Sequence, residues 1–430
     1  MASQKKLGFI ALTSLVFGNM VGSGMFMLPS SLASYGSIGL VAWVATAIGA
    51  IFLALVFSRL ARVCPKSGGP YAYCREAFGD FTGFQIAYCY WIATWVGNAA
   101  IVVALMGPLA YFFPILKVQP YAIMCSLGVL WLATWINISG VKQAGFVQVV
   151  TAVMKFIPIL GMAFLGFFYM DMGGLSAYNI SGESNLSAFA ATASMTVWSF
   201  IGIESATVPA GEAENPKVNI PRATVLGTLL ATLVYVASTA VIMGLVPMQE
   251  LAQSDAPFVL AAEKLFGHWG GDFVAIVSIV AILGTLNGWI LMQAQMPMAA
   301  AEDGLFPKLF CKLGKKGTPV FGLTISSLLI SVLLLMHSDQ GLVRQFVLIT
   351  ELAVVATLIP YLYSAVCEIV LMITRPELLE GRQERRSAWL MGLLAFVFVF
   401  LAFFGVDAEI FLPVLLLLLS SAMAYVAIIK

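Results

Sequence analysis

The stretch Gly18-Asn19-Met20-Val21-Gly22-Ser23-Gly24 lies in the middle of a long apolar run from about residue 8 to residue 33. Glycines on both sides of Ser23, with Pro29 downstream, favour an interruption of the helix that this run would otherwise form. Backbone N–H and C=O groups freed at membrane depth persist only where they line a cavity or meet other protein groups. We therefore expect an unwound segment within a membrane span, with close helix packing through small residues as the competing interpretation.

A second stretch of the same kind is Trp198-Ser199-Phe200-Ile201-Gly202-Ile203-Glu204-Ser205, within the apolar segment 188–211. It again places serine and glycine in mid-segment, and it adds a carboxylate that is costly in lipid. Corresponding interrupted helices in two halves of a chain are typical of inverted-repeat transporters, whose substrate binds at the breaks. The half-helix N-termini at such breaks present unpaired N–H groups to an anionic group of the substrate.

The composition as a whole indicates a membrane protein. Of the 430 residues, 61% are hydrophobic and 10% are charged, whereas soluble domains are nearer half apolar and a quarter charged. These values exclude a soluble enzyme and a disordered chain, and a net charge of +1 argues against a nucleic-acid binder. Long unbroken apolar runs also differ from the alternating strands of an outer-membrane barrel. The class that remains is an all-α polytopic membrane protein.

Twelve segments have the roughly 20 apolar residues that a spanning helix needs. They are 8–33, 38–60, 82–112, 120–140, 146–169, 188–211, 222–246, 272–298, 318–336, 345–371, 388–406 and 409–428. With both termini in the cytoplasm, eighteen Lys and Arg residues fall on that side, and only Lys117, Lys264 and Arg344 fall on the other. This asymmetry follows the positive-inside rule.

We expect a single transporter domain over residues 1–430. Within it, 8–169 (spans 1–5) and 188–371 (spans 6–10) would be two inverted repeats, and 388–428 would hold spans 11 and 12. Six cysteines without CxxC spacing and two histidines, His268 and His337, give little material for a disulfide framework or a metal site. We expect no metal and no cofactor.

Several motifs, in order along most of the chain, resemble the amino acid–polyamine–organocation superfamily. They are Gly18–Phe26 with Leu28-Pro29, Ser67-Gly68-Gly69-Pro70-Tyr71-Ala72-Tyr73, Trp198–Ser205, Glu212-x-x-Asn215-Pro216 with Ile220-Pro221-Arg222, Asp303-Gly304-Leu305-Phe306-Pro307, and Ile359-Pro360-Tyr361-Leu362-Tyr363. The likeness is greatest to the basic amino acid/polyamine antiporter family, which includes the bacterial arginine–agmatine exchangers. It implies a five-plus-five, leucine-transporter-like fold with broken helices 1 and 6, in the inner membrane and often in a homodimer.

The resemblance also implies functional positions. The substrate-binding positions are Asn19, Gly22, Ser23, Gly24, Thr94, Asn98, Trp198, Ile201, Trp289 and Ala353, and the gating or coupling positions are Tyr90, Lys155, Glu204 and Glu351. The backbone of 22–24 would hold the substrate carboxylate, and the Ile201 carbonyl would meet its amino group. Trp198 would close over the substrate and Trp289 would line its side chain, since an aromatic face stabilises a cation by about 0.5–2 kcal/mol.

Some of these positions allow more than one interpretation. Asn19 and Asn98 also suit hydrogen bonds between helices. Lys155 lies in mid-span, where many sodium-independent members of the superfamily have a lysine whose ammonium stands in for a sodium ion. It would serve as a structural or coupling cation, with Glu204 or Glu351 as the nearest carboxylate, or it would snorkel to an interface. Glu351 itself would pair with a cation or lie in water near a helix end.

The expected function is secondary active antiport by alternating access. A cationic amino acid would exchange for its decarboxylated amine or for another amino acid. Ala353 stands where the arginine exchangers have a serine, which leaves the substrate open. The alternative is a proton-coupled or facilitative uptake carrier for neutral or broad-range amino acids. An enzyme is not expected, because the sequence has no metal-ligand cluster and no nucleophile–base pair; the partners are amino acid and amine substrates and the lipid bilayer, and no nucleic acid.

Overall fold

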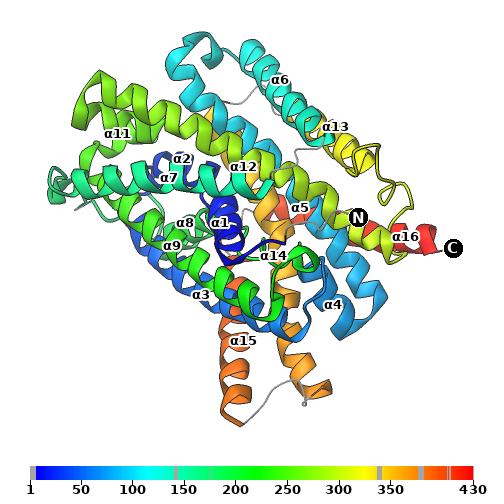
Figure 1. Cartoon of the computed structure of the whole chain (residues 1–430). Helices are drawn as coiled ribbons and strands as arrows, with labels where there is room; N and C mark the ends of the chain where they lie inside the picture. The colour runs from blue at the N-terminus through cyan, green and yellow to red at the C-terminus, as the bar shows by residue number, and fades with distance from the viewer. Residues whose placement is uncertain are drawn as a thin grey trace.

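The fold is almost entirely helical (Figure 1). The computed structural model describes residues 6–139, 144–175, 177–336, 341–375, 382–403, 405 and 408–429. Within these ranges the one extended pairing is an isolated bridge between Leu7 and Ala213. His337 lies outside the described residues, as do Lys5, Lys142 and Lys430, three of the eighteen basic residues counted on the cytoplasmic side.

The helices follow one another with short connections. In the first half of the chain they are α1 (Phe9–Met20), α2 (Ser23–Ala33), α3 (Ile38–Val63), α4 (Pro70–Phe78), α5 (Asp80–Phe112), η1 (Pro114–Lys117), α6 (Gln119–Ile138), α7 (Ala144–Phe167) and η2 (Met172–Leu175). In the second half they are α8 (Asn185–Val197), η3 (Trp198–Phe200), η4 (Ala210–Glu212), α9 (Pro216–Leu245), α10 (Met248–Ala252), α11 (Pro257–Phe266), α12 (His268–Glu302), α13 (Val320–Met336), α14 (Leu342–Thr374), α15 (Arg382–Phe403) and α16 (Ala408–Ile429).

The helices correspond to the expected spans with one exception. Among the described residues, nine helical segments are long and apolar enough to cross a membrane, and Val320–Met336 and Leu418–Ile428 are shorter apolar helices. Together they account for every predicted span except 188–211. There α8 ends at Val197, and irregular turns follow η3 instead of a continuous helix.

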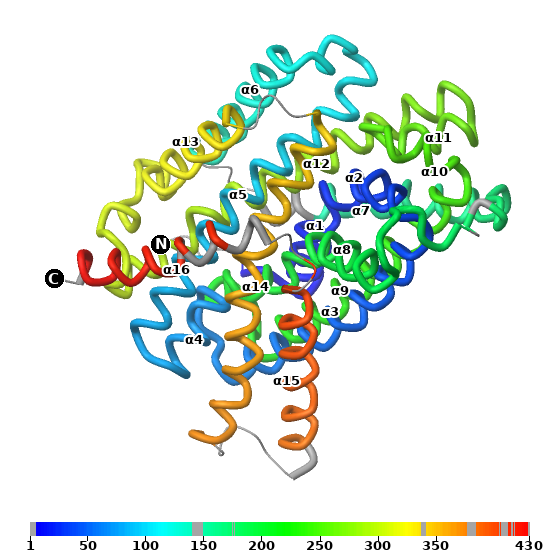
Figure 2. Tube along the Cα trace, turned by 180° about the vertical axis from the view of Figure 1, so that it is seen from behind, coloured from blue at the N-terminus to red at the C-terminus, as the bar shows by residue number. Residues whose placement is uncertain are grey.

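The long helices α5, α12 and α14 form the centre of the molecule. α5 packs against both α14 and α12, while α3 packs against α9, and α1 lies against α9 and α7. α6 and α13 pack on each other along one edge, and α15 projects from the body, as both views show (Figures 1 and 2). The broken helices α1–α2 and α8–η3 lie between the α3–α9 pair on one side and the central helices α5, α12 and α14 on the other.

The outer surface of the helices is apolar. Large side chains such as Met124, Phe164 and Phe168 are 70%, 67% and 68% exposed, which in water would be a severe aggregation liability. The interior, in contrast, holds charged groups, with Lys155 and Glu204 fully buried. Apolar outside and ionisable inside is the arrangement of a membrane-embedded helical protein.

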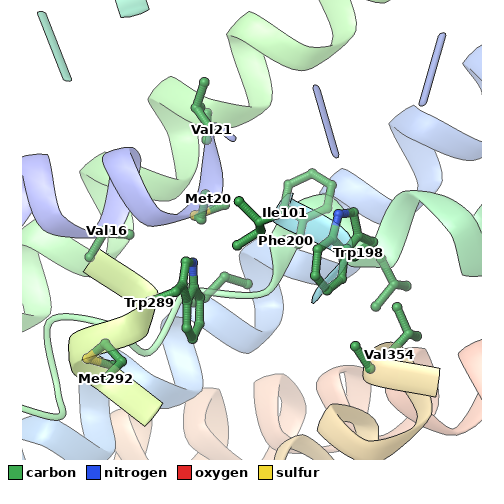
Figure 3. Close-up of a cluster of buried hydrophobic side chains, with 14 of the residues drawn as sticks. Val16, Met20, Val21, Ile101, Trp198, Phe200, Trp289, Met292 and Val354 are labelled. Atoms are coloured by element: carbon green, nitrogen blue, oxygen red, sulfur yellow. The ribbon is translucent and has the colours of Figure 1, made fainter. Parts of the chain in front are cut away.

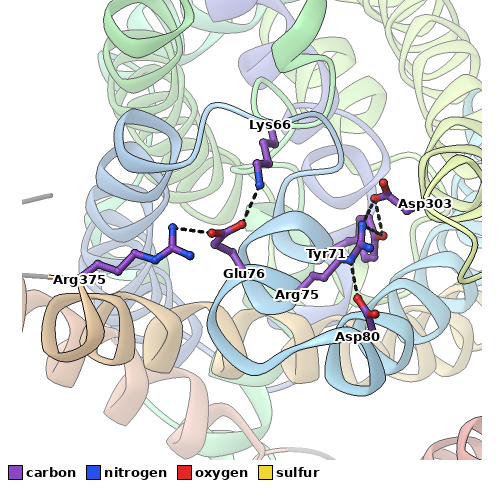
Figure 4. A network of polar contacts seen from close by, with 7 residues as sticks. All are labelled: Lys66, Tyr71, Arg75, Glu76, Asp80, Asp303 and Arg375. Atoms are coloured by element: carbon purple, nitrogen blue, oxygen red, sulfur yellow. Dashed lines mark hydrogen bonds and ion pairs between the residues drawn. The ribbon is translucent and has the colours of Figure 1, made fainter.

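An ion-pair network joins the segments that the charge distribution assigns to the cytoplasmic side (Figure 4). Arg75 of α4 contacts Asp80 at 2.7 Å and Asp303, at the end of α12, at 2.6 Å. Glu76 contacts Lys66 at 2.7 Å and Arg375, at the end of α14, at 2.6 Å. α4 thus links the ends of α12 and α14 to the α3–α4 loop.

Candidate functional site

The first span is interrupted at Val21 and Gly22. α1 ends at Met20 and α2 begins at Ser23, which confirms the predicted interruption and places it one residue earlier than the centre of the Gly22-Ser23-Gly24 stretch. The last carbonyls of α1 and the first N–H groups of α2 have no partners within their own helices. A negative and a positive helix end therefore meet inside the protein.

Lys155 of α7 occupies the carbonyl end of this break. Its Nζ donates to the carbonyl oxygens of Gly18 and Val21 at 2.9 and 3.1 Å, and to Thr285 Oγ1 at 2.6 Å. The Thr285 hydroxyl also lies 3.1 Å from the Gly18 carbonyl and 3.3 Å from that of Val21. A fully buried ammonium thus satisfies the orphan carbonyls at the C-terminus of α1, where the helix dipole favours a cation.

The second interruption follows α8. Ile201 has an extended backbone, and Gly202 has φ +114°, a value that side chains other than glycine rarely adopt. Asn19 joins the two breaks, because its Nδ2 donates to Ser205 Oγ at 3.0 Å. Trp289 Nε1 of α12 donates to the Asn19 carbonyl at 3.0 Å, so three elements are held together here.

A cavity lies where the two breaks meet α5 and α12. It is lined by Asn19, Met20, Ser23, Gly24, Tyr90, Ala93, Thr94, Gly97, Ile101, Trp198, Ile201, Thr285, Trp289 and Thr357. Polar and aromatic side chains thus converge on one buried space, as they do in small-molecule sites. Figure 3 shows Ile101 between the indoles of Trp198 and Trp289.

Trp198 fits its place because two glycines make room for it. A Cβ at Gly24 would lie 2.8 Å from Trp198 Cδ1, and a Cβ at Gly97 would lie 3.1 Å from its Cη2. The indole also packs edge-on against Phe346, with ring centroids 6.4 Å apart. The ring therefore forms a wall of the cavity between α2, α5 and α14.

Glu204 lies beside the cavity and is held by two tyrosines. Its Oε1 accepts from the Tyr90 hydroxyl at 2.6 Å, and its Oε2 accepts from the Tyr361 hydroxyl at 2.5 Å. The Gly202 N–H lies 3.3 Å from Glu204 Oε2. These bonds connect α5 and α14 across the irregular part of the sixth span.

Comparison with known proteins gives the family. The sequence profile of the family described as "Amino acid permease" matches residues 7–429. The chain belongs to this family. Membership in the amino acid–polyamine–organocation superfamily, which the motifs indicated, is thereby confirmed, and the protein is a multi-pass membrane transporter rather than an enzyme.

The permease has relatives and a structural neighbour that cover most of its length. It is 35% identical to the cadaverine/lysine antiporter of Escherichia coli K12, over 95% of this chain and 91% of that one. It is 36% identical to the putrescine transporter PotE of Haemophilus influenzae, over 86% of each chain. The fold resembles that of MhsT, solved in complex with L-phenylalanine, with a TM-score of 0.66 at 13% identity, covering 92% of this chain and 98% of that one. The expected leucine-transporter-like fold is confirmed.

The structure brings most of the predicted site residues of the permease to one place. The residues that line the cavity are Asn19, Ser23, Gly24, Thr94, Trp198, Ile201, Trp289 and the gating candidate Tyr90. Gly22 lies just behind it, since a Cβ there would be 2.6 Å from Thr285 Cγ2. Glu204 and Lys155 contact cavity residues, namely Tyr90 and Thr285.

Apart from Gly22, Lys155 and Glu204, which lie behind or against the wall, three predicted residues do not line the cavity. Ala353 is fully buried within α14, and Glu351 is half-buried. Asn98 donates a hydrogen bond to Gln293 Oε1 of α12 at 2.7 Å, as expected for an asparagine that joins two helices. The described hydrogen bonds of Lys155 go to backbone carbonyls and a hydroxyl, because the C-terminal end of α1 supplies the negative potential. That Glu204 or Glu351 is the nearest carboxylate stays a prediction.

Sequence reasoning missed Thr285, Thr357 and Tyr361. Tyr361 belongs to the Ile359–Tyr363 motif, but the motif alone does not show that its hydroxyl reaches Glu204 from another helix. Thr285 lies one helical turn before Trp289, so a polar residue at i−4 from a site aromatic was the available signal.

Proposed function

We propose that the permease exchanges a cationic amino acid such as lysine for a diamine such as its decarboxylation product, by alternating access. The observation that carries the proposal is the cavity at the junction of the two broken spans, between Trp198 and Trp289. It combines free helix N–H groups for a carboxylate with aromatic faces for a cation. The relatives named for lysine, cadaverine and putrescine support this substrate class.

Each element of the cavity has a role in this proposal. The substrate carboxylate binds the first N–H groups of α2, at Ser23 and Gly24, and the Ile201 carbonyl accepts from the α-amino group. Trp198 closes over the bound molecule, and Trp289 contacts its side chain. Glu204 with its two tyrosines closes the path on one side, and Lys155 holds the end of α1 in both orientations of the transporter.

Counterflow in proteoliposomes tests the proposal. Vesicles loaded with lysine, with cadaverine or with buffer alone are placed in radiolabelled lysine. We expect uptake with either internal substrate and almost none into vesicles loaded with buffer alone. Uptake into buffer-loaded vesicles that follows an imposed pH gradient would instead support the proton-coupled carrier.

We further propose the arrangement in the membrane. The excess of basic residues on one set of loops supports an inner-membrane protein with both termini in the cytoplasm. Residues 8–169 and 188–371 would be the inverted repeats, and 388–428 would add two spans. A reporter fused after residue 430 that is active only outside the cytoplasm should stay inactive. The homodimer that the resemblance implies would appear as a crosslinked pair in the membrane at low expression.

A further inference from the structure

Four lysines lie close together in the loop that joins α12 to α13. Lys308, Lys312, Lys315 and Lys316 are all exposed, and we call them the lysine cluster. The loop connects the ends of two helices that pack on each other (Figure 1), and the charge distribution assigns it to the cytoplasmic side. The lysine cluster therefore lies at the end of a spanning helix.

The lysine cluster has no carboxylate partner among the residues that the structure describes. None of its members forms an ion pair there. Other basic residues assigned to the same side do have such a partner, namely Arg59, Arg62, Lys66, Arg75 and Arg375. The positive charge of the cluster is thus open to an anion from outside the chain.

Two exposed leucines accompany the lysine cluster. Leu309 and Leu313 come directly after Lys308 and Lys312, and they are 48% and 56% exposed. Cationic and apolar side chains thus share one short exposed stretch. This combination suits the boundary between lipid headgroups and acyl chains, where apolar side chains are buried and cations meet phosphate.

The loop is held in place by two buried phenylalanines. Phe306 and Phe310 are 4% and 6% exposed. The centroid of the Phe310 ring lies 5.5 Å from that of Trp91 in α5 and 5.0 Å from that of Phe321 in α13. The Phe306 ring lies 5.4 Å from Phe84 of α5. Because these rings anchor the loop from the inside, the lysine cluster and both leucines are presented on its outer side without the entropic cost of ordering a flexible segment.

We propose that the lysine cluster, together with Leu309 and Leu313, binds the headgroup of an anionic glycerophospholipid. The lysine ammonium groups neutralise the lipid phosphate, and the leucines contact the upper part of the acyl chains. Clusters of four or more basic residues beside a spanning helix attract acidic lipids in this way. None of these residues lines the substrate cavity, so the inference does not depend on the proposed exchange.

Photo-crosslinking in proteoliposomes tests the site directly. The full-length protein is reconstituted in phosphatidylcholine with a trace of either phosphatidylglycerol or phosphatidylcholine that carries a photoactivatable group in its acyl chain. Mass spectrometry then gives the yield of each crosslinked lipid in the segment 306–317. We expect the yield of phosphatidylglycerol to exceed that of phosphatidylcholine about fivefold or more, and about 0.5 M NaCl to reduce this ratio at least about twofold.

Two double variants separate the lysine cluster from positive charge in general. Lys308→Gln/Lys312→Gln should lower the ratio about threefold or more, since each lysine near the membrane surface contributes up to about fivefold in affinity. Lys217→Gln/Arg222→Gln removes the same charge from the start of α9, on the same side, and should leave the ratio unchanged. A monodisperse size-exclusion peak of each variant is the folding control.

A third variant and a soluble phosphate ester test the acyl-chain contact. Leu309→Asn/Leu313→Asn should lower the yields of both lipids, because their acyl chains lose apolar contacts. An excess of sn-glycerol 3-phosphate, which has the phosphate but no acyl chain, should not displace the phosphatidylglycerol probe.

Four results would overturn the inference. Equal yields of the two lipids in the wild type would mean that the lysines only orient the chain in the membrane. An equal loss of the ratio in both lysine variants would make the preference a property of the whole cytoplasmic face. Displacement by sn-glycerol 3-phosphate would identify a free phosphate ester as the ligand, and unchanged yields in Leu309→Asn/Leu313→Asn would contradict the contact with acyl chains.

Discussion

The ammonium of Lys155 is the only charged side-chain group that touches the break in the first span among the described residues. It contacts the Gly18 and Val21 carbonyls, and no carboxylate forms an ion pair with it there. Removing one partner from such a buried arrangement leaves the others unsatisfied, which costs far more than the loss of a surface contact.

We therefore expect Lys155→Met to abolish exchange at every pH, since the carbonyl end of α1 loses the group that holds it. Counterflow rates between pH 5 and pH 8 measure this loss. A monodisperse size-exclusion peak of the variant in detergent is the folding control. A variant that keeps residual exchange with a flattened pH profile would identify a proton switch. Wild-type rate and profile would contradict both roles.

Glu204 depends on two hydroxyl donors from different helices. Tyr361→Phe removes the bond to Oε2 and Tyr90→Phe removes the bond to Oε1, each without loss of ring packing. We expect each variant to slow exchange about tenfold, and the double variant to lose less than the product, because the three groups act as one network. The exchange rates of the wild type, the two single variants and the double variant form a double-mutant cycle. Strictly multiplicative losses would show that the tyrosines act independently.

At the scale of the element, the break in the first span shows what a sequence can reveal. Two glycines around Ser23 marked the position to within one or two residues, because local backbone preferences decide where a helix stops. The hydrogen-bond partners of Lys155 could not be predicted, since they depend on how α7 and α12 approach α1, and no local pattern records that approach. The irregular backbone after Ile201 was likewise only partly visible, because Gly202 marked a break but not the loss of the following helix.

Gly24 is a sharp test of this element. A Cβ there would lie 2.5 Å from Ser199 Oγ and 2.8 Å from Trp198 Cδ1, whereas a Cβ at Gly128 of α6 would meet nothing within 4 Å. We expect Gly24→Ala to reduce lysine exchange at least about tenfold, because the added methyl group displaces the cavity wall. Gly128→Ala should leave exchange intact. Equal activity of the two variants would show that the approach of Trp198 to α2 is not required.

At the scale of the whole molecule, segments far apart in the chain close one side of the protein. The network of Arg75, Glu76, Lys66, Arg375 and Asp303 is one polar connection there (Figure 4). Such partly exposed pairs contribute about 0.2–1 kcal/mol each. They are therefore suited to bias an equilibrium between two open states without preventing it.

We expect Glu76→Gln to favour the state that is open on this side. The rate at which a cysteine placed at Thr357, in the cavity wall, reacts with a maleimide added from that side should rise about two- to fivefold. Glu250→Gln, which breaks the pair with Lys264 elsewhere, is the matched control and should leave the rate unchanged. A rate unaffected by Glu76→Gln would show that the network does not restrain opening.

The same network has a defined pH dependence. The hydrogen bond from Lys66 holds the pKa of Glu76 below its ordinary value, against the opposing effect of burial, and Arg375 adds to the lowering. The pairing lowers the pKa of this carboxylate in the closed state relative to its ordinary, unpaired value. It therefore stabilises the closed state fully above the ordinary pKa, and this effect is lost as the pH falls through the lowered pKa. The thiolate fraction of the cavity cysteine itself changes with pH, so the informative quantity is a ratio of rates. The reactivity of the Glu76→Gln protein relative to that of the protein with Glu76 should stay constant from pH 8 to pH 5.5.

The ammonium at the first break is covalently part of α7, so it cannot leave on either side of the membrane. In the proposed exchange this fixed cation stays in the protein while the solutes move. The gradients of the exchanged solutes and the membrane voltage then set the driving force. Exchange of external lysine for an internal diamine moves one net positive charge outward, against about 2.3 kcal/mol per 100 mV of interior-negative potential. The two concentration ratios together must then exceed roughly fiftyfold per 100 mV. A cell that decarboxylates the imported amino acid would maintain such a ratio.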